Sequence, residues 1–405
     1  MIPRAIRIGI DARPLQAETR YRGIGKTLEN ILQALSKLSR PCPIAFTFYV
    51  DSRLPRPKTL NLFPGATIED VKSSDLRLGR YAQVFVTPFR AISPARGSVD
   101  VLLQADAALG VPTSVPTLVI FYDVIPLLFR EQERQLEELP SVWKRYKREI
   151  GRHGGWAKYI RMLNSYKRAA GVVAISESSR KDLLKYRKEI SPSKVRVIYL
   201  GSLDTPTTRA VSAKTRKLAR GRYLLYVGGI DVRKNVIALL DTYIRLKQTY
   251  KDLRLIVVGK EFELKKQLEI IGWSKLIRDT PKAAKDVIIS GFLRDGDLHY
   301  LYRNAIAFVF PSRYEGFGLP VLEAMQLGCP VVAYDNSSIP EVAGTAALLV
   351  KDGADMLPSI AQLMESEELR HSLMEQGFIQ AAKFTWERTS GEILSALIEI
   401  AESQS

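Results

Sequence analysis

The chain is poor in the side chains that build disulfide frameworks and metal sites. Its 405 residues include only two cysteines, Cys42 and Cys329, and three histidines. Two cysteines far apart in the sequence are too few for a disulfide framework or a cysteine-based zinc site. This usage is typical of a reducing compartment, so we expect a cytoplasmic protein without a metal cofactor.

Long hydrophobic runs are also missing. Residues 1–10 contain no apolar core of signal-peptide length, and we interpret them as a first strand. The most apolar stretch, 117–129, is interrupted by Asp123 and Pro126 and is shorter than the ~20 residues that span a bilayer. The sequence therefore predicts no integral membrane segment and leaves open only peripheral attachment, at the inner leaflet of the plasma membrane.

Acidic residues are scarce in the first half of the chain. The formal net charge is +17, and residues 1–200 carry 34 basic and 18 acidic side chains against 26 and 25 in residues 201–405. Segment 144–196 alone holds 16 basic and 4 acidic residues. Such a basic segment attracts nucleic acid, an anionic membrane surface or a phosphate-bearing substrate. A solvated helix face is the alternative explanation.

Short β-branched runs alternate with helical patterns along the whole chain, which predicts parallel sheets in an α/β fold. We predict two Rossmann-like, doubly wound domains that face a central cleft, where ligands bind at the carboxyl ends of the strands. The predicted boundaries are 1–200 for the first domain, 201–222 for a linker, 223–385 for the second domain, and 386–405 for a C-terminal helix that packs back toward the first domain.

The expected strands are 5–10, 44–50, 117–122, 171–175, 195–200, 223–227, 253–258, 287–290, 307–310 and 330–334. The expected helices are 24–38, 177–186, 236–247, 295–302, 320–326 and 386–401.

A glycine-rich turn opens the first predicted helix. Gly25 to Thr27 resemble the end of a Walker A loop, but Arg20 stands where that motif needs a glycine. The backbone amides around Gly23 and Gly25 are instead expected to approach a phosphate or a sugar. A tight turn without a ligand is the alternative.

A second glycine pair, Gly228 and Gly229, follows a predicted strand, and Arg233 and Lys234 come just before the next helix. The helix dipole disfavours two cations at a helix N-terminus. A bound diphosphate would resolve this conflict, because its charge would meet both side chains and the free amides. A solvated pair of surface cations is the alternative.

The most specific segment is 311–325, PSRYEGFGLPVLEAM. Two glycines let backbone amides face a ligand, and Pro320 suits the first position of a helix. Glu323 is expected in the first turn of that helix, with Glu315 on the loop before it. Two carboxylates beside exposed amides suit a polyhydroxylated ligand, and helix capping by Glu323 is the alternative.

At these residues the chain resembles the retaining GT-B glycosyltransferases of family 4. Glu315 and Glu323 match the E-x7-E motif of that family, and Arg233 to Asn235 match its phosphate-binding R-K-N turn. Five shorter segments resemble the mannosyltransferase-like branch: 9–13, 22–25, 123–127, 175–179 and 384–386.

The resemblance implies that domain 1–200 binds the acceptor and that domain 223–385 binds the sugar nucleotide. It also implies roles for individual residues. Arg233 and Lys234 would neutralise the diphosphate, Glu323 would bind the ribose, and Glu315 with the amides of residues 316–319 would hold the donor sugar. The implied donor-binding set is Gly23, Gly25, Gly229, Arg233, Lys234, Leu293, Glu315, Gly316, Phe317, Gly318, Leu319 and Glu323. The implied catalytic residues are Glu315, Arg233, Lys234 and Asp123, and the implied acceptor-binding residues are Tyr122 and Asp123.

Two positions depart from the family pattern. Many members have Gly-Arg where this chain has Gly228 and Gly229, so Arg233 and Lys234 must meet more of the phosphate charge. Many also have His-Asp where this chain has Tyr122 and Asp123.

The expected reaction follows from leaving-group charge. As the bond between sugar and phosphate breaks, negative charge grows on the diphosphate, and positioned cations stabilise it without a metal. The resemblance implies retention through a front-face reaction rather than through a carboxylate nucleophile. The resulting hypothesis is transfer of mannose from GDP-mannose to a saccharide or lipid-linked acceptor in bacterial surface polysaccharide synthesis.

Three alternatives remain at this point, and the oligomeric state is open. In the first alternative, the donor is UDP-glucose or another UDP-hexose instead of GDP-mannose. In the second, the same fold performs phosphorylase or epimerase chemistry. The third is a basic nucleic-acid-binding protein, which would leave the loop 316–320 unexplained, so we expect no nucleic acid partner.

The basic segment yields the first testable prediction. Replacing Lys144, Arg145, Lys147 and Arg148 with Glu should release the protein from anionic liposomes, because the electrostatic attraction to the leaflet is lost. Co-sedimentation with vesicles measures this release. If the variant sediments with the vesicles as much as the wild type does, the hypothesis of peripheral attachment is wrong.

Overall fold

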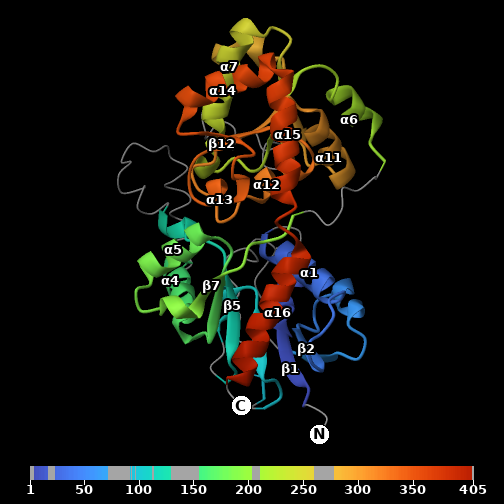
Figure 1. Cartoon of the computed structure of the whole chain (residues 1–405), viewed down its shortest axis with the longest axis vertical. Helices are drawn as coiled ribbons and strands as arrows, with labels where there is room; N and C mark the ends of the chain where they lie inside the picture. Colours follow the sequence, from blue (N-terminus) through green and yellow to red (C-terminus); the bar gives the residue numbers. More distant parts are fainter. Residues whose placement is uncertain are drawn as a thin grey trace. The chain divides into compact units, whose positions relative to one another are not determined.

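The computed structural model describes residues 4–16, 23–71, 92, 94–95, 97–111, 114–128, 155–202, 210–259 and 278–403. The chain divides into two compact units, Met1–Gly201 with Thr385–Ser405, and Ser202–Phe384. Each unit contains one parallel sheet with helices packed against it (Figure 1). The predicted α/β fold with two Rossmann-like halves is confirmed.

The first unit contains a seven-stranded sheet in the order β3-β2-β1-β4-β5-β6-β7. Its strands are β1 (Ile6–Asp11), β2 (Ile44–Val50), β3 (Thr67–Asp70), β4 (Val101–Gln104), β5 (Thr117–Phe121), β6 (Gly171–Ala174) and β7 (Val195–Val197). Its α-helices are α1 (Gly23–Leu35), α4 (Gly155–Ser165), α5 (Glu177–Tyr186) and α16 (Trp386–Glu402). Short 3₁₀ helices occupy Arg13–Leu15, Lys58–Leu62, Ala107–Leu109, Tyr166–Arg168 and Pro192–Lys194. Every residue of the central strands β4, β5 and β6 is buried, as is typical of a parallel sheet covered on both faces.

The C-terminal helix α16 belongs to this first unit and runs beside α1 (Figure 1). The side chain of Thr385 caps it by accepting from the Arg388 N–H at 3.1 Å. On the buried face of α16, the Ser390 hydroxyl donates to the Ile31 carbonyl in α1 at 3.0 Å. Trp386 is buried against Gly201, where a Cβ atom would lie 2.4 Å from the Trp386 nitrogen. Residues from the two ends of the sequence thus share one core.

The second unit contains a six-stranded sheet in the order β10-β9-β8-β11-β12-β13. Its strands are β8 (Tyr223–Val227), β9 (Arg254–Val258), β10 (Val287–Gly291), β11 (Ala307–Phe310), β12 (Val331–Tyr334) and β13 (Leu348–Val350). Its helices are α6 (Ala213–Leu218), the 3₁₀ turn η7 (Val232–Lys234), α7 (Val236–Thr249), α10 (Pro281–Ala284), α11 (Asp295–Asn304), α12 (Leu319–Gln326), α13 (Ile339–Ala343), α14 (Gly353–Glu365) and α15 (Glu367–Ala381). In chain order its strands pair 3-2-1-4-5-6, the doubly wound order whose direction reverses between the first and fourth strands.

Several elements differ from the sequence prediction. Strands β3, β4 and β13 were not expected. β3 carries no buried residue, and β4 and β13 are only four and three residues long. Helix α1 ends at Leu35 rather than at residue 38. The described part of the expected linker holds α6, which lies in the second unit, where Asp297 of α11 accepts from the Ser212 N–H at 2.8 Å.

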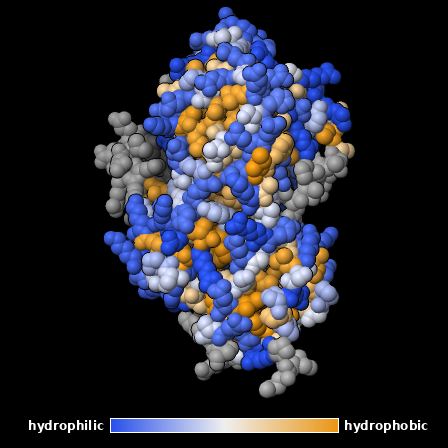
Figure 2. All heavy atoms as spheres, in the orientation of Figure 1, coloured by the Kyte–Doolittle hydropathy of each residue, from blue (hydrophilic) through white to orange (hydrophobic). Residues whose placement is uncertain are grey.

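Polar side chains dominate the visible face of both units, and hydrophobic groups are interspersed among them (Figure 2). Within the described ranges, no helix combines the length and the apolar character that a bilayer crossing requires.

Two glycines of the first unit give opposite stability predictions. Gly391 lies inside the long helix α16, and a Cβ added there would meet nothing within 4 Å. Gly391→Ala should therefore raise the free energy of unfolding by ~0.5–1 kcal/mol. Gly201→Ala should lower it by ~1–3 kcal/mol, because the new methyl overlaps Trp386. Denaturant titrations of both variants measure the two changes, and equal shifts would contradict this packing.

Candidate functional site

The candidate site of the second unit lies between β8 and β11, where the order of the strands in the sheet reverses. Strands β8 and β11 pair as neighbours in the sheet although about 80 residues separate them in the chain. In open α/β sheets, ligands bind outside the carboxyl ends of the strands at such a point. The segment after β8 carries Arg233 and Lys234, and the segment after β11 carries Glu315.

The turn after β8 delivers both cations to this edge. The fully buried Tyr226 donates its phenol proton to the Gly229 carbonyl at 2.6 Å, which fixes the start of the turn. Arg233 and Lys234 occupy the 3₁₀ turn η7, and Asn235 then adopts a left-handed conformation with φ 50° before α7 begins. The left-handed residue separates the cations from the helix proper, which reduces the conflict with its dipole.

The loop after β11 is joined to that turn and depends on one glycine. The Arg313 N–H donates to the Arg233 carbonyl at 2.8 Å. Gly318 caps α12 with φ 101°, and a Cβ atom there would approach Ile339 Cδ1 to 2.6 Å. Only glycine satisfies both the backbone conformation and the space.

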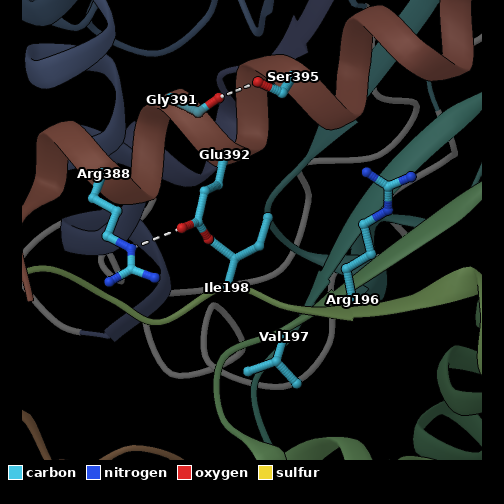
Figure 3. A pocket seen from close by; sticks show the side chains of 7 residues that line it. All are labelled: Arg196, Val197, Ile198, Arg388, Gly391, Glu392 and Ser395. Carbon is cyan, nitrogen blue, oxygen red and sulfur yellow. Dashed lines mark hydrogen bonds and ion pairs between the residues drawn. The ribbon is translucent and has the colours of Figure 1, made fainter.

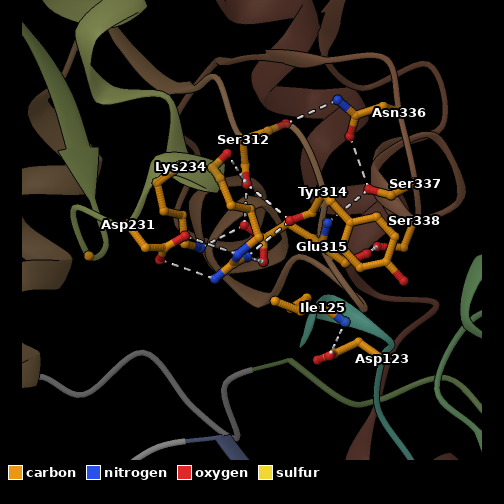
Figure 4. Close-up of polar contacts among 12 residues, drawn as sticks. Asp123, Ile125, Asp231, Lys234, Ser312, Tyr314, Glu315, Asn336, Ser337 and Ser338 are labelled. Carbon is orange, nitrogen blue, oxygen red and sulfur yellow. Dashed lines mark hydrogen bonds and ion pairs between the residues drawn. The ribbon is translucent and has the colours of Figure 1, made fainter. Parts of the chain in front are cut away.

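Glu315 is the centre of a polar network that joins the two loops (Figure 4). Its Oε1 accepts from Lys234 Nζ and from Ser312 Oγ, each at 2.6 Å. Its Oε2 accepts from Arg233 Nη1 at 2.7 Å. Arg233 also pairs with Asp231, with 3.2 Å between Nε and Oδ1. The structure thus brings together three of the predicted catalytic residues.

The centre of this network lies largely out of water, with Asp231 exposed at its edge, and its charges are compensated. Glu315 and Lys234 are 8% and 9% exposed. Burial alone would raise the pKa of Glu315, but attraction to Lys234 and Arg233, with the hydrogen bonds of Lys234 and Ser312, holds that pKa below its ordinary value. The carboxyl group is therefore ionised at neutral pH, and two carboxylates balance the two cations.

A third loop, between β12 and α13, holds the main chain of Glu315. Ser337 Oγ accepts from the Glu315 N–H, and Ser338 Oγ donates to the Glu315 carbonyl, both at 3.0 Å. Asn336 Nδ2 donates to the Ser312 carbonyl at 3.1 Å. Sequence reasoning missed these residues. The available signal was a run of small polar side chains just after β12, the neighbour of β11 in the sheet.

Glu323 differs from the expectation. Helix α12 begins at Leu319, so Glu323 is its fifth residue and not part of the first turn. The helix N-terminus therefore does not stabilise its charge. Burial, followed by the negative charge of Asp295, raises the pKa of Glu323 to about 7. This carboxyl group is partly protonated at neutral pH, rather than fully ionised and ready to accept hydroxyl groups.

The other predicted donor residues of the second unit offer mainly backbone. The Phe317 side chain is buried and packs edge-on against Phe384, with 5.9 Å between ring centroids, so only its main chain can face a ligand. Gly316 and Gly318 are buried, and Leu319 begins α12. Leu293 is half-buried just after the edge strand β10, next to Phe292, whose side chain is 74% exposed.

The remaining predicted residues belong to the first unit. Gly23, with φ 42°, is the first residue of α1, whereas Gly25 is buried inside that helix and not in the turn before it. Asp123 follows β5, and its Oδ1 accepts from the Ile125 N–H at 2.9 Å (Figure 4). Burial, with a smaller effect of Asp106, raises the pKa of Tyr122 far above its ordinary value. Tyr122 therefore stays protonated and cannot replace a histidine as a base.

Residues 144–154 of the predicted basic segment lie outside the described residues. Near the end of the segment, β7 and α16 border a groove of about 420 Å³ (Figure 3). Its two lining arginines are both paired, Arg196 with Glu399 and Arg388 with Glu392. The groove is thus nearly neutral and does not extend a cationic surface. The described ranges also hold no cluster of three or more His, Cys, Asp or Glu side chains suited to a metal ion.

Comparison with known proteins finds a family match within the second unit. Residues 208–380 match the model of the family "Glycosyl transferases group 1". The serotype-specific mannosyltransferase WbdA of Escherichia coli is 25% identical over 438 residues, which cover 97% of this chain and 48% of WbdA. The O-antigen chain mannosyltransferase B of Escherichia coli is 36% identical over 184 residues, 44% of this chain and 46% of that protein. The chain thus spans about half the length of the curated relatives it matches.

A solved structure supports the fold of the whole chain. HepE from Anabaena, determined in complex with UDP and glucose, is 16% identical and superposes with a TM-score of 0.65 over 97% of this chain and 99% of that one. The fold is therefore that of GT-B glycosyltransferases. The second unit matches the group 1 glycosyl transferase model, and the chain is similar to bacterial mannosyltransferases, as the motifs of the sequence imply.

The raised pKa of Glu323 predicts how stability depends on pH. The folded-state pKa is about 7 against an ordinary value of 4.5, so the folded protein binds this proton more tightly than the unfolded chain. The contribution to stability is complete below pH 4.5 and is lost as the pH rises through 7. Glu323→Gln should therefore lose less melting temperature than the wild type between pH 5 and pH 8. If the melting temperatures of the two proteins fell by the same amount between pH 5 and pH 8, this assignment would be contradicted.

Proposed function

We propose that the chain is a retaining glycosyltransferase that moves mannose from GDP-mannose to a saccharide acceptor, carried on a lipid, in bacterial surface polysaccharide synthesis. The observation that carries this proposal is that Arg233 and Lys234 pair with Glu315 at the point where the strand order of the second sheet reverses. Such a point binds nucleotides in doubly wound folds. Two cations there suit a diphosphate, and a carboxylate suits sugar hydroxyl groups.

The chemistry follows from where charge develops. When the bond from the anomeric carbon to the phosphate oxygen breaks, the nucleoside diphosphate leaves with additional negative charge. Lys234 and Arg233 stabilise that charge more strongly than they stabilise the intact donor, and this difference accelerates the reaction. The burial of Lys234 and the partial burial of Arg233 strengthen the effect, since the surroundings screen charge less than water does. The proposed reaction needs no metal ion.

Retention is proposed through a front-face route and not through an enzyme nucleophile. Both carboxylate oxygens of Glu315 accept hydrogen bonds in the free protein, and in the donor complex this carboxylate is proposed to accept sugar hydroxyl groups, so it is assigned a binding role and not that of a nucleophile. In the proposed route, the departing phosphate oxygen takes the proton of the acceptor hydroxyl as the new bond forms on the same face.

The identity of the donor rests on similarity. Both Escherichia coli relatives are named mannosyltransferases, which supports mannose and hence GDP-mannose. HepE was solved with UDP and glucose, which keeps a UDP-hexose as the alternative donor. The proposed diphosphate recognition by Arg233 and Lys234 depends on neither the base nor the hexose, so these two cations would serve either donor.

The acceptor is assigned to the first unit, through Asp123 and the main chain around Tyr122. Attachment of segment 144–196 to an anionic membrane surface is part of the same proposal, since a lipid-linked acceptor would lie there. A nucleic-acid-binding function has no comparable support, because it leaves the network around Glu315 without a use.

The donor site is tested by thermal shift with GDP and with UDP. A ligand at a hundred times its dissociation constant stabilises the native state by about 2.7 kcal/mol, a shift of roughly a few degrees. We expect a larger shift with GDP than with UDP, and loss of the shift in Lys234→Ala, where one phosphate partner is missing.

The possible outcomes separate the parts of the proposal. A shift with UDP alone would keep the enzyme class and overturn mannose as the donor sugar. Equal shifts in the wild type and in Lys234→Ala would show that the nucleotide does not bind at this network. No shift with either nucleotide would refute the donor site altogether.

A further inference from the structure

The two cations of the proposed phosphate site are already occupied in the free protein. Lys234 Nζ lies 2.6 Å from Glu315 Oε1, and Arg233 Nη1 lies 2.7 Å from Glu315 Oε2. Each cation therefore faces a different oxygen of one carboxylate, as it would face different oxygens of a phosphate group. A diphosphate that enters must take these cations from Glu315.

The charges make coexistence unfavourable. A carboxylate that stayed between the cations would repel the diphosphate at close range, in surroundings that screen charge weakly. Ser312 Oγ, 2.6 Å from Oε1, is a neutral donor that can remain with Glu315 after the cations leave. The carboxylate would then keep one hydrogen bond and have accepting positions open.

From this geometry, and resting on the proposed function, we propose that Glu315 acts as a stand-in for the diphosphate: in the free protein its carboxylate pairs with the two cations that bind the diphosphate of the donor. When the donor binds, Lys234 and Arg233 transfer to the phosphate oxygens, and the released carboxylate accepts hydroxyl groups of the donor sugar. Recognition of the phosphate and recognition of the sugar are thereby coupled. A diphosphate without a sugar leaves Glu315 without these new partners, so the carboxylate competes for the cations again and favours release of the product.

The same argument assigns Ser337 and Ser338 as positioning residues. They bind the N–H and the carbonyl of Glu315, so the main chain stays in place while the carboxylate exchanges partners. Ser337 adopts φ 47°, which is uncommon for a residue other than glycine and is found where surrounding contacts enforce it. Ser338 is fully buried, with its hydroxyl on the Glu315 carbonyl.

The test compares dissociation constants of the wild type and Glu315→Gln, measured by isothermal titration calorimetry. The probes are inorganic pyrophosphate, GDP, UDP, GDP-mannose and UDP-glucose. The stand-in model predicts that Glu315→Gln binds pyrophosphate and the nucleoside diphosphates about tenfold more tightly, because no charged carboxylate has to be displaced. It also predicts a smaller preference for a sugar nucleotide over its diphosphate.

The matched control is Glu323→Gln, which removes another carboxyl group of the same unit, one that pairs with neither cation. This variant should not bind pyrophosphate more tightly than the wild type. Because Glu315→Gln leaves the buried Lys234 and the partly buried Arg233 without their carboxylate, its fold is checked by circular dichroism. If it does not fold, Glu315→Asp takes its place: the shorter side chain keeps the charge but reaches Lys234 and Arg233 less well, so pyrophosphate binding should also tighten, by a smaller factor.

The positioning residues need a readout that a general loss of stability does not change. We expect Ser338→Ala to lower the ratio of sugar-nucleotide affinity to diphosphate affinity, with pyrophosphate binding preserved. Ser337→Gly, which tolerates φ 47° without a hydroxyl, should lower the same ratio. An unchanged ratio in both variants would overturn their assignment.

Failure of this inference can be told apart from failure of the proposed function. If the wild type binds pyrophosphate and a nucleotide while Glu315→Gln binds them equally or more weakly, the stand-in role is wrong and the donor site stands. If the wild type binds neither pyrophosphate nor any nucleotide, both are wrong.

Discussion

A buried carboxylate held between a buried lysine and a partly buried arginine is the constraint on which the rest of this site depends. Removing one partner would leave an uncompensated charge away from water, so Glu315, Arg233 and Lys234 must be delivered together. The sheet order achieves this by placing β8 beside β11. The left-handed Asn235, the glycine at position 318 and the serines after β12 then fix how each loop leaves its strand.

The network also links the fold to the proposed chemistry. A site whose cations stood unpaired would carry strong positive charge in weakly screening surroundings, which is costly in the free protein. Pairing with Glu315 and Asp231 lowers that cost while keeping both cations positioned. In the proposed reaction they are ready for the leaving group without large rearrangement of the backbone, which is how preorganised electrostatic stabilisation accelerates group transfer.

Sequence reasoning predicted the two Rossmann-like halves, because alternating apolar runs and helical patterns report strand and helix directly. It also singled out Glu315, Arg233 and Lys234, since their motifs stand at strand ends. Their mutual pairing was not predictable, because it depends on the adjacency of strands about 80 residues apart. Glu323 was misplaced because the conformation of Gly318, rather than Pro320, sets where α12 begins. The burial of the Tyr122 hydroxyl group and the contacts of Ser337 and Ser338 depend on packing that no local pattern encodes.

The most direct test of the central claim is a proton NMR time course of the purified protein with GDP-mannose and a mannoside acceptor. The account predicts that GDP and a new α-linked mannoside form together, with the configuration of the donor retained, and that Lys234→Ala slows both. Formation of a β-linked product would contradict the proposed front-face mechanism. If neither GDP-mannose nor UDP-glucose were consumed under conditions where GDP or UDP binds, glycosyl transfer at this site would be refuted.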